Sequence, residues 1–146
     1  MQAITLLSEH PLDAEAALEH CSDPGHGAVD LFIGRVRNRN QGRDVRAVSY
    51  DMHQALCRRV FDAICGEAHE RWGHPLRLWL AHRSGRLAVG EASVIAAASS
   101  PHRNEAFLAC RYLVEQMKHR APIWKQEHYV DGDSEWVQGH ALCQHG

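Results

Sequence analysis

A four-residue apolar repeat in the middle of the chain constrains the fold more than any other feature. It runs from Gln54 to Trp72, where an apolar residue recurs at every fourth position: Leu56, Val60, Ile64, Ala68 and Trp72. Cys57 and Phe61 lie beside this stripe. Because residues i and i+4 share one face of a helix, the segment is predicted to be an amphipathic helix with one face in a core.

A second helix is predicted to begin at Ser100 and to end by about Arg120 or Ala121. Ser100 suits the N-cap and Pro101 suits the first helical position. Pro122 ends the helix, because proline has no N–H group and disfavours helical geometry in the residue before it. The buried stripe of this helix is predicted to be Phe107, Cys110, Val114 and Met117.

The other segments favour strands and turns. A short helix is expected in residues 11–21, near Asp13, and a short strand or turn in 85–91. Strands are predicted for residues 27–37, 44–52, 76–82, 92–99 and 122–130. Residues 38–43 are expected to join the first two strands as a hairpin loop. This order mixes hairpins with helical crossovers, so we expect one α+β domain over residues 1–146 with a mixed or mostly antiparallel sheet.

The composition restricts the compartment and the kind of partner. Of 146 residues, 45% are apolar and 23% are charged, and the net charge of −2 argues against a nucleic-acid binder. The N-terminal segment lacks the pattern of a signal peptide, and no window approaches the roughly 18 apolar residues of a membrane helix. The five cysteines form no C-x-x-C pair and the twelve histidines form no H-x-x-x-H pair. We expect a cytoplasmic protein with reduced thiols, no metal site and no membrane contact.

Three basic clusters are candidates for an anion-binding site. In the first, the alternation of a strand puts Leu31, Ile33, Arg35 and Arg37 on one face and Phe32, Gly34 and Val36 on the other. That face is either a core face that runs out into a cleft or an edge hairpin kept soluble by charge. Gly34 indicates a close backbone approach or a bulge.

The second cluster places His102 and Arg103 at the start of a helix. Cations are disfavoured there by the helix dipole, whereas a bound anion would be stabilised by the free N–H groups. Glu105, one turn further on, partly offsets the positive charge and favours the alternative without a ligand.

The third cluster is a pair of lysines on either side of a proline. Lys118 lies in the last turn of the second helix, where the dipole favours a cation in any case. Lys125 follows Pro122 on a predicted strand. A reversal at Pro122 can bring the two ammonium groups together, and like charges held close lower each other's pKa.

Four blocks of this sequence closely resemble the MoaE family, the large catalytic subunits of molybdopterin synthase. They are "GRVRNRNQG", "HRSGRLAVGEASV", "SSPHRNEAFLACRYLVEQMK" and "KHRAPIWKQEHYVDGDSEWV", in the family's order from about Gly27 to Val137. The resemblance implies an α/β hammerhead-type fold and a homodimeric sulfurtransferase. Each end of the dimer would bind a small ubiquitin-like sulfur-carrier subunit, which gives a heterotetramer.

The resemblance also implies the reaction and the residues that carry it. The carrier's C-terminal Gly-Gly tail, as a thiocarboxylate, would deliver two sulfur atoms to cyclic pyranopterin monophosphate and form the dithiolene of molybdopterin, for the molybdenum cofactor. Lys118 and Lys125 match the family's two active-site lysines, and no cofactor is expected because the sulfur arrives on the partner. The substrate-binding positions that match are Arg37, His102, Arg103 and Phe32. His140 is the candidate replacement for an arginine that some relatives carry after the Trp-Val pair.

Two other functions are compatible with the basic clusters. A non-catalytic phosphate- or nucleotide-binding module would use the same cations without performing chemistry. An RNA-binding hairpin domain fits the arginine-rich loop, but the net charge is slightly negative and no strand of the R-G-F/Y-G/A-F type is present.

Overall fold

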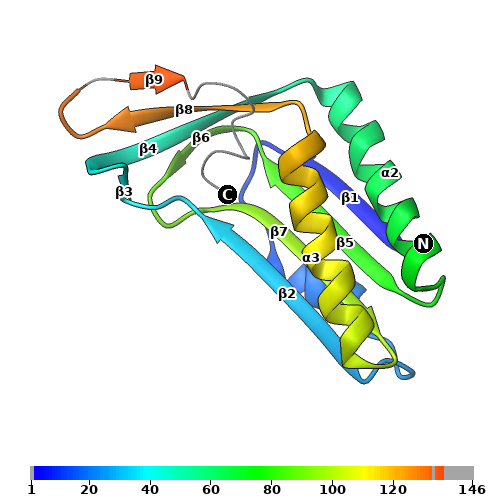
Figure 1. Cartoon of the computed structure of the whole chain (residues 1–146). Helices are drawn as coiled ribbons and strands as arrows, with labels where there is room; N and C mark the ends of the chain where they lie inside the picture. Colours follow the sequence, from blue (N-terminus) through cyan, green and yellow to red (C-terminus); the bar gives the residue numbers. More distant parts are fainter. Residues whose placement is uncertain (1, 133, 137–146) are drawn as a thin grey trace.

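The structure is a computed structural model, and it describes residues 2–132 and 134–136. Within these residues the chain forms nine strands and three helices (Figure 1). In chain order the elements are β1 (Ala3–Ser8), α1 (Ala14–His20), β2 (Ala28–Arg35), β3 (Arg39–Asn40), β4 (Arg43–Met52), α2 (Gln54–Trp72), β5 (Arg77–Arg83), β6 (Gly85–Ala88), β7 (Ala92–Ser100), α3 (Arg103–Arg120), β8 (Ile123–Tyr129) and β9 (Ser134–Trp136).

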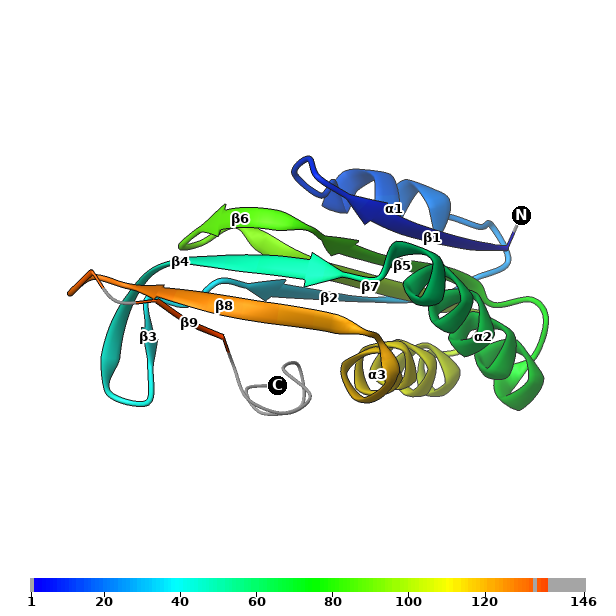
Figure 2. The same cartoon turned by 90° about the horizontal axis from the view of Figure 1, so that it is seen from above.

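The first sheet has the strand order β1-β5-β7-β2 and carries the main core. β1 and β5 are parallel, and the other pairs are antiparallel. Alternate residues of β5 and β7 point to opposite faces, so Leu78 and Leu80 pack under α2 and α3 while Trp79 and Ala81 pack against α1. Figure 2 shows α1 and α3 on opposite sides of this sheet.

The second sheet has the order β3-β4-β8-β9, and β6 also pairs with β4. It lies beyond the end of the first sheet, on the side where α3 ends (Figure 1). A small separate core holds it together, made of Val36, Val45, Val48, Leu87 and Tyr129. The mixed, mostly antiparallel α+β architecture predicted from the sequence is confirmed.

The helix bounds follow the sequence except at the start of α3. α2 begins and ends as predicted, and α3 ends at Arg120 with Ala121 as its C-cap. The predicted N-cap was wrong. Ser100 is the last residue of β7 and pairs with Ala28 of β2, so the helix cannot begin until His102 serves as the N-cap.

The buried faces of both helices are shifted from the predicted stripes. α2 buries Cys57, Phe61, Ile64, Cys65 and Ala68, which leaves Leu56 exposed. α3 buries Ala106, Ala109 and Leu113, which the predicted stripe omits, whereas Phe107 is 58% exposed. A stripe chosen by the size of its side chains is displaced where alanines make the close contacts.

The predicted hairpin between residues 27–37 and 44–52 is also wrong. β2 pairs with β7 in the first sheet, and β4 pairs with β8 and β6 in the second. The tight turn is real, but it joins the two-residue strand β3 to β4 through Gln41 and Gly42, both at positive φ. The sequence patterns did not indicate β1, which lies at the edge of the first sheet.

Candidate active site

A polar pocket of about 100 Å³ lies where the two sheets meet the C-terminal end of α3. Its walls come from the end of β2 and the segment after it, and from β3, β4, β5, β7, α3 and β8. The lining residues are Gly34, Arg35, Val36, Arg37, Arg39, Asn40, Val48, Tyr50, His82, Ser93, Val94, Met117, Lys118, Lys125 and Glu127.

Lys118 and Lys125 both line this pocket, and they are the only lysines in the sequence. Lys118 lies in the last turn of α3, and β8 begins directly after Pro122. On β8, Lys125 and Glu127 share a face with the buried Ile123, whereas Trp124 points the other way and is exposed. The reversal at Pro122 therefore brings both lysines to one cavity.

The pKa of Lys125 is lowered, chiefly because the ammonium group is buried. The neighbouring carboxylate of Glu127 opposes this by favouring the charged lysine. The positive charges of Lys118 and Arg37 lower the pKa of Lys125 further. An amine in this setting exchanges a proton more readily near neutral pH than an exposed lysine does.

Arg37 reaches the pocket because β2 is irregular at its end. The register of β2 against β7 shifts between Gly34 and Arg35, so the strict alternation expected over 27–37 is broken. A Cβ atom on Gly34 would lie 2.6 Å from Cγ1 of Val94, so only glycine allows this approach to β7. The segment after β2 then places Arg35, Val36 and Arg37 together on the pocket wall.

His102 and Arg103 lie at the other end of α3. Arg103 and Lys118 are 15 residues apart on one helix, which corresponds to about 22 Å at 1.5 Å per residue. Both His102 and Arg103 are exposed, and the His102 side chain makes no capping hydrogen bond. One chain therefore does not bring this pair to the lysine pocket.

Phe32 is not among the residues that line the lysine pocket, although its ring lies beside Gly34, which does line it. It is 36% exposed on β2 and lines a groove between β2 and α3 with Cys110 and Val114. Among the described residues, β2 pairs with β7 on one side and with no strand on the other. His140 falls outside the described residues.

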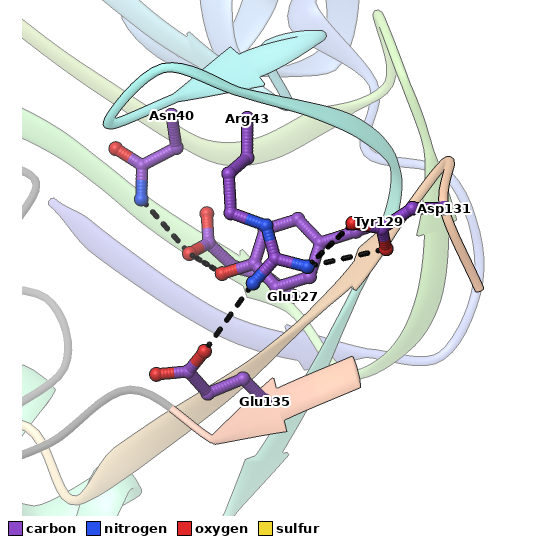
Figure 3. A network of polar contacts seen from close by, with 6 residues as sticks. All are labelled: Asn40, Arg43, Glu127, Tyr129, Asp131 and Glu135. Atoms are coloured by element: carbon purple, nitrogen blue, oxygen red, sulfur yellow. Dashed lines mark hydrogen bonds and ion pairs between the residues drawn. The ribbon is translucent and has the colours of Figure 1, made fainter. Parts of the chain in front are cut away.

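The structure adds a buried carboxylate, Glu127, that is not among the site residues predicted from the sequence. Its Oε1 accepts hydrogen bonds from Nδ2 of Asn40 at 2.8 Å and from the hydroxyl of Tyr129 at 3.2 Å (Figure 3). The guanidinium of Arg43 lies over the Tyr129 ring at 3.6 Å. Arg43 also pairs with Asp131 at 2.9 Å. This network ties the β3–β4 turn to β8, and two of its members, Asn40 and Glu127, line the pocket.

Glu127 lies two residues after Lys125, on the same face of the strand, and that spacing is the signal that could have found it. His82 and Tyr50 of the pocket carry no comparable signal, because each lies in a segment that predicts only a strand. The pocket therefore combines several cations with one buried carboxylate and one buried imidazole. Such a set can hold an anionic ligand, polarise a carbonyl group and move protons.

The described cysteines are all free and buried: Cys21, Cys57, Cys65 and Cys110. Burial raises the pKa of Cys57 to about 11 and that of Cys65 to about 12, so neither thiol is a nucleophile near neutral pH. Within residues 2–132 and 134–136, no three His, Cys, Asp or Glu side chains are placed to hold a metal ion. The described helices also include none with the length and apolar character needed to span a bilayer.

Comparisons with known proteins identify the family. The family model for "MoaE protein" matches residues 7–120. The molybdopterin synthase catalytic subunit of Synechococcus elongatus is 49% identical and covers 94% of this chain and 84% of its own length.

Two solved structures share the fold. The molybdopterin synthase structure from Staphylococcus aureus has a TM-score of 0.85 at 31% identity, and covers 91% of this chain and 96% of its own. A complex of subunits 1 and 2 of molybdopterin-converting factor from Helicobacter pylori has a TM-score of 0.75 at 22% identity, and covers 97% and 93%. The resemblance found in the sequence is thus confirmed, and the chain belongs to the MoaE family of molybdopterin synthase catalytic subunits.

Proposed function

We propose that this chain transfers sulfur from a thiocarboxylated small carrier subunit to cyclic pyranopterin monophosphate, and so forms the dithiolene of molybdopterin. The observation that carries the proposal is the pocket that holds Lys118, Lys125 and Arg37 together. Both reactants bring negative charge to the site, one as a thiocarboxylate and the other as a cyclic phosphate. A pocket lined by cations stabilises both.

The two lysines supply the catalytic groups. Sulfur transfer requires proton movement at the substrate and stabilisation of the negative charge that develops on oxygen. Lys125 suits such work because burial and neighbouring cations lower its pKa. One lysine polarises the carbonyl of the carrier tail, and the other moves protons at the pterin. The sulfur arrives on the carrier, so the reaction requires no cofactor from this subunit.

The partner that delivers the sulfur is a small ubiquitin-like subunit whose C-terminal Gly-Gly tail enters the pocket. The solved Helicobacter pylori structure, a complex of two subunits of molybdopterin-converting factor with this fold, supports a two-subunit assembly. The four buried free cysteines favour a reducing compartment, which supports a cytoplasmic location.

A second copy of the chain completes the substrate site. His102 and Arg103 lie about 22 Å along α3 from Lys118, too far to contact the same small ligand. The edge of β2 that pairs with no described strand, with Phe32 beside it and the exposed Phe107 on α3, is a surface that a second copy can cover. In a homodimer, one protomer then provides the lysines and its partner provides the phosphate-binding pair.

Reconstitution with three components tests the catalytic proposal. Purified chain, thiocarboxylated carrier and cyclic pyranopterin monophosphate are mixed, and the dithiolene product is measured. We expect the Lys118→Ala, Lys125→Ala double variant to lose at least about 100-fold in rate. Arg58→Ala, on the exposed face of α2, is the matched control that removes one cation elsewhere. Product formation at the wild-type rate by the double variant would contradict the proposal.

The same assay separates this function from a non-catalytic phosphate- or nucleotide-binding module. Such a module binds the ligand but makes no product with any thiocarboxylated carrier. Ligand binding without turnover in the wild-type protein would favour the module over the enzyme.

A further inference from the structure

His82 is a buried pocket residue to which the proposed lysine chemistry assigns no role. On β5, Leu78 and Leu80 point into the core beneath α2 and α3, and His82 is the next residue on that face. Its side chain is only 1% exposed, yet it lines the pocket with Lys118 and Lys125. The face of the strand thus changes from leucine to imidazole where the core meets the pocket.

The hydrogen bonding of His82 defines which ring nitrogen carries the proton. Nδ1 lies 2.7 Å from the carbonyl oxygen of Arg83. A carbonyl oxygen only accepts, so Nδ1 donates, and Nε2 of the neutral ring carries the lone pair. Within residues 2–132 and 134–136, Nε2 has no hydrogen-bond partner. Nε2 is the ring nitrogen farther from the backbone of β5.

The surroundings keep this imidazole neutral and hold it in place. Burial, together with the positive charge of Lys118, lowers the pKa of His82 to about 4, although the hydrogen bond to Arg83 opposes the shift. The ring of Tyr50 packs against the imidazole edge-on, with 4.9 Å between the ring centroids. Near neutral pH, His82 therefore presents a fixed hydrogen-bond acceptor without a charge.

Half of the ten polar side chains that line this pocket can only donate hydrogen bonds: Arg35, Arg37, Arg39, Lys118 and Lys125. Arginines and the two lysines contribute cations, and Oε1 of Glu127 already accepts from Asn40 and Tyr129. A ligand that carries only anionic groups needs no further acceptor. A pterin carries N–H donors as well as its phosphate, and a buried donor without an acceptor weakens binding.

We propose that Nε2 of His82 accepts a hydrogen bond from an N–H group of the bound pterin and orients the ring system relative to the two lysines. The inference rests on the proposed function, because it takes the pterin as the substrate of this pocket. It assigns His82 to substrate binding and predicts that the residue acts on the pterin and not on the carrier tail.

Two substitutions of His82 separate the acceptor from the bulk of the side chain. Gln places an amide oxygen near the position of Nε2, whereas Leu fills similar space without an acceptor. We expect His82→Leu to raise the KM for the pterin about tenfold and to leave the KM for the thiocarboxylated carrier unchanged. His82→Gln should stay within about threefold of the wild type in both constants. Thermal unfolding of each variant confirms that it is folded at the assay temperature.

Several results would overturn the inference. They are an unchanged pterin KM in a folded His82→Leu variant, a His82→Gln variant as impaired as His82→Leu, and an equal rise in both KM values. Titration of the pterin into each protein without carrier provides a readout that is independent of turnover. If the wild type binds the pterin but makes no product, the proposed function fails while the binding comparison still decides the role of His82. If the wild type does not bind the pterin, both the proposed function and the role of His82 are contradicted.

Discussion

The two ends of α3 both carry candidate site cations, but in opposite environments. At the C-terminal end, Lys118 is half-buried in a pocket with Lys125, and the helix dipole favours its charge. At the N-terminal end, His102 and Arg103 are exposed where the dipole disfavours cations, and the His102 side chain makes no capping hydrogen bond. The chain itself supplies favourable surroundings for its cations at one end only.

This difference indicates how the site is assembled. The lysine end is organised within one chain by the reversal at Pro122 and by the neighbouring Glu127. At the end with His102 and Arg103, a bound anion would be favourable at the helix N-terminus. In the proposed homodimer, the partner protomer brings this pair to the lysine pocket. Under the proposed function, the C-terminal end of α3 is therefore a catalytic half-site and the N-terminal end is a binding half-site.

Complementation between two inactive variants is the strongest test of the difference between the two ends of α3. We expect Lys118→Ala to lose about 100-fold in rate and Arg103→Ala to lose at least about tenfold. Co-expression of the two variants should restore about one quarter of the wild-type rate, because half of the randomly paired dimers are hybrids and each hybrid has one intact site. Assay of the mixed preparation against each variant alone measures the recovery. No recovery, in a preparation shown to contain hybrid dimers, would mean that both ends of α3 act within one chain.

The pH dependence of stability sharpens the description of the lysine end. The pKa of His82 is about 4 in the folded chain and 6.5 in the unfolded chain, so the unfolded state binds more protons between these values. Stability is therefore lost as pH falls from about 6.5 to 4, by at most about 3 kcal/mol from this residue, and no further below that. Urea unfolding across this range measures the loss.

The titratable and charged groups that line the pocket with His82 are Lys118 from α3, Lys125 and Glu127 from β8, Tyr50 from β4, and Arg35, Arg37 and Arg39. Carboxylates elsewhere among the described residues also contribute stability that is lost at low pH. One of them is Glu67, whose pKa is lowered by Arg120. The His82→Gln variant removes the contribution of the imidazole and leaves the others, so its curve should be flatter than that of the wild type. Parallel curves would contradict a buried neutral imidazole.

The smallest effect that we expect lies at the N-terminal end of α3. His102→Asp adds a capping acceptor and a negative charge at the positive end of the dipole, and should stabilise the chain by about 1 kcal/mol. The same change should weaken pterin binding, because it places a carboxylate beside the phosphate. His102→Asn adds the cap without the charge and serves as the control. Urea unfolding at low ionic strength measures the gain, and a loss of stability in both variants would contradict the comparison.

The sequence predicted elements well where the signal is local. The apolar period of four residues defined α2 from Gln54 to Trp72, and Pro122 defined the end of α3. Prediction from the sequence failed where the structure is decided by pairing between residues far apart in the chain. Ser100 has the chemistry of an N-cap, but it continues β7 because β2 is its partner in the sheet.

The same distinction holds for the candidate site. Lys118 and Lys125 are close in sequence on either side of one proline, so their shared pocket could be predicted. The partner of Glu127 is Asn40, 87 positions away, and His82 reaches the pocket only because β5 runs beneath it. No local pattern in the sequence indicates contacts of that kind.

The pKa of Lys125, followed by NMR, tests most directly the claim that the C-terminal end of α3 holds two coupled lysines in one buried pocket. The chain contains two lysines, so 15N labelling of lysine side chains yields two signals, which Lys118→Ala assigns. We expect the pKa of Lys125 to lie below the ordinary value of 10.5. It should rise in Lys118→Ala, which removes a neighbouring positive charge, and fall further in Glu127→Gln, which removes a negative one. An ordinary pKa for Lys125 that responds to neither substitution would contradict the shared pocket.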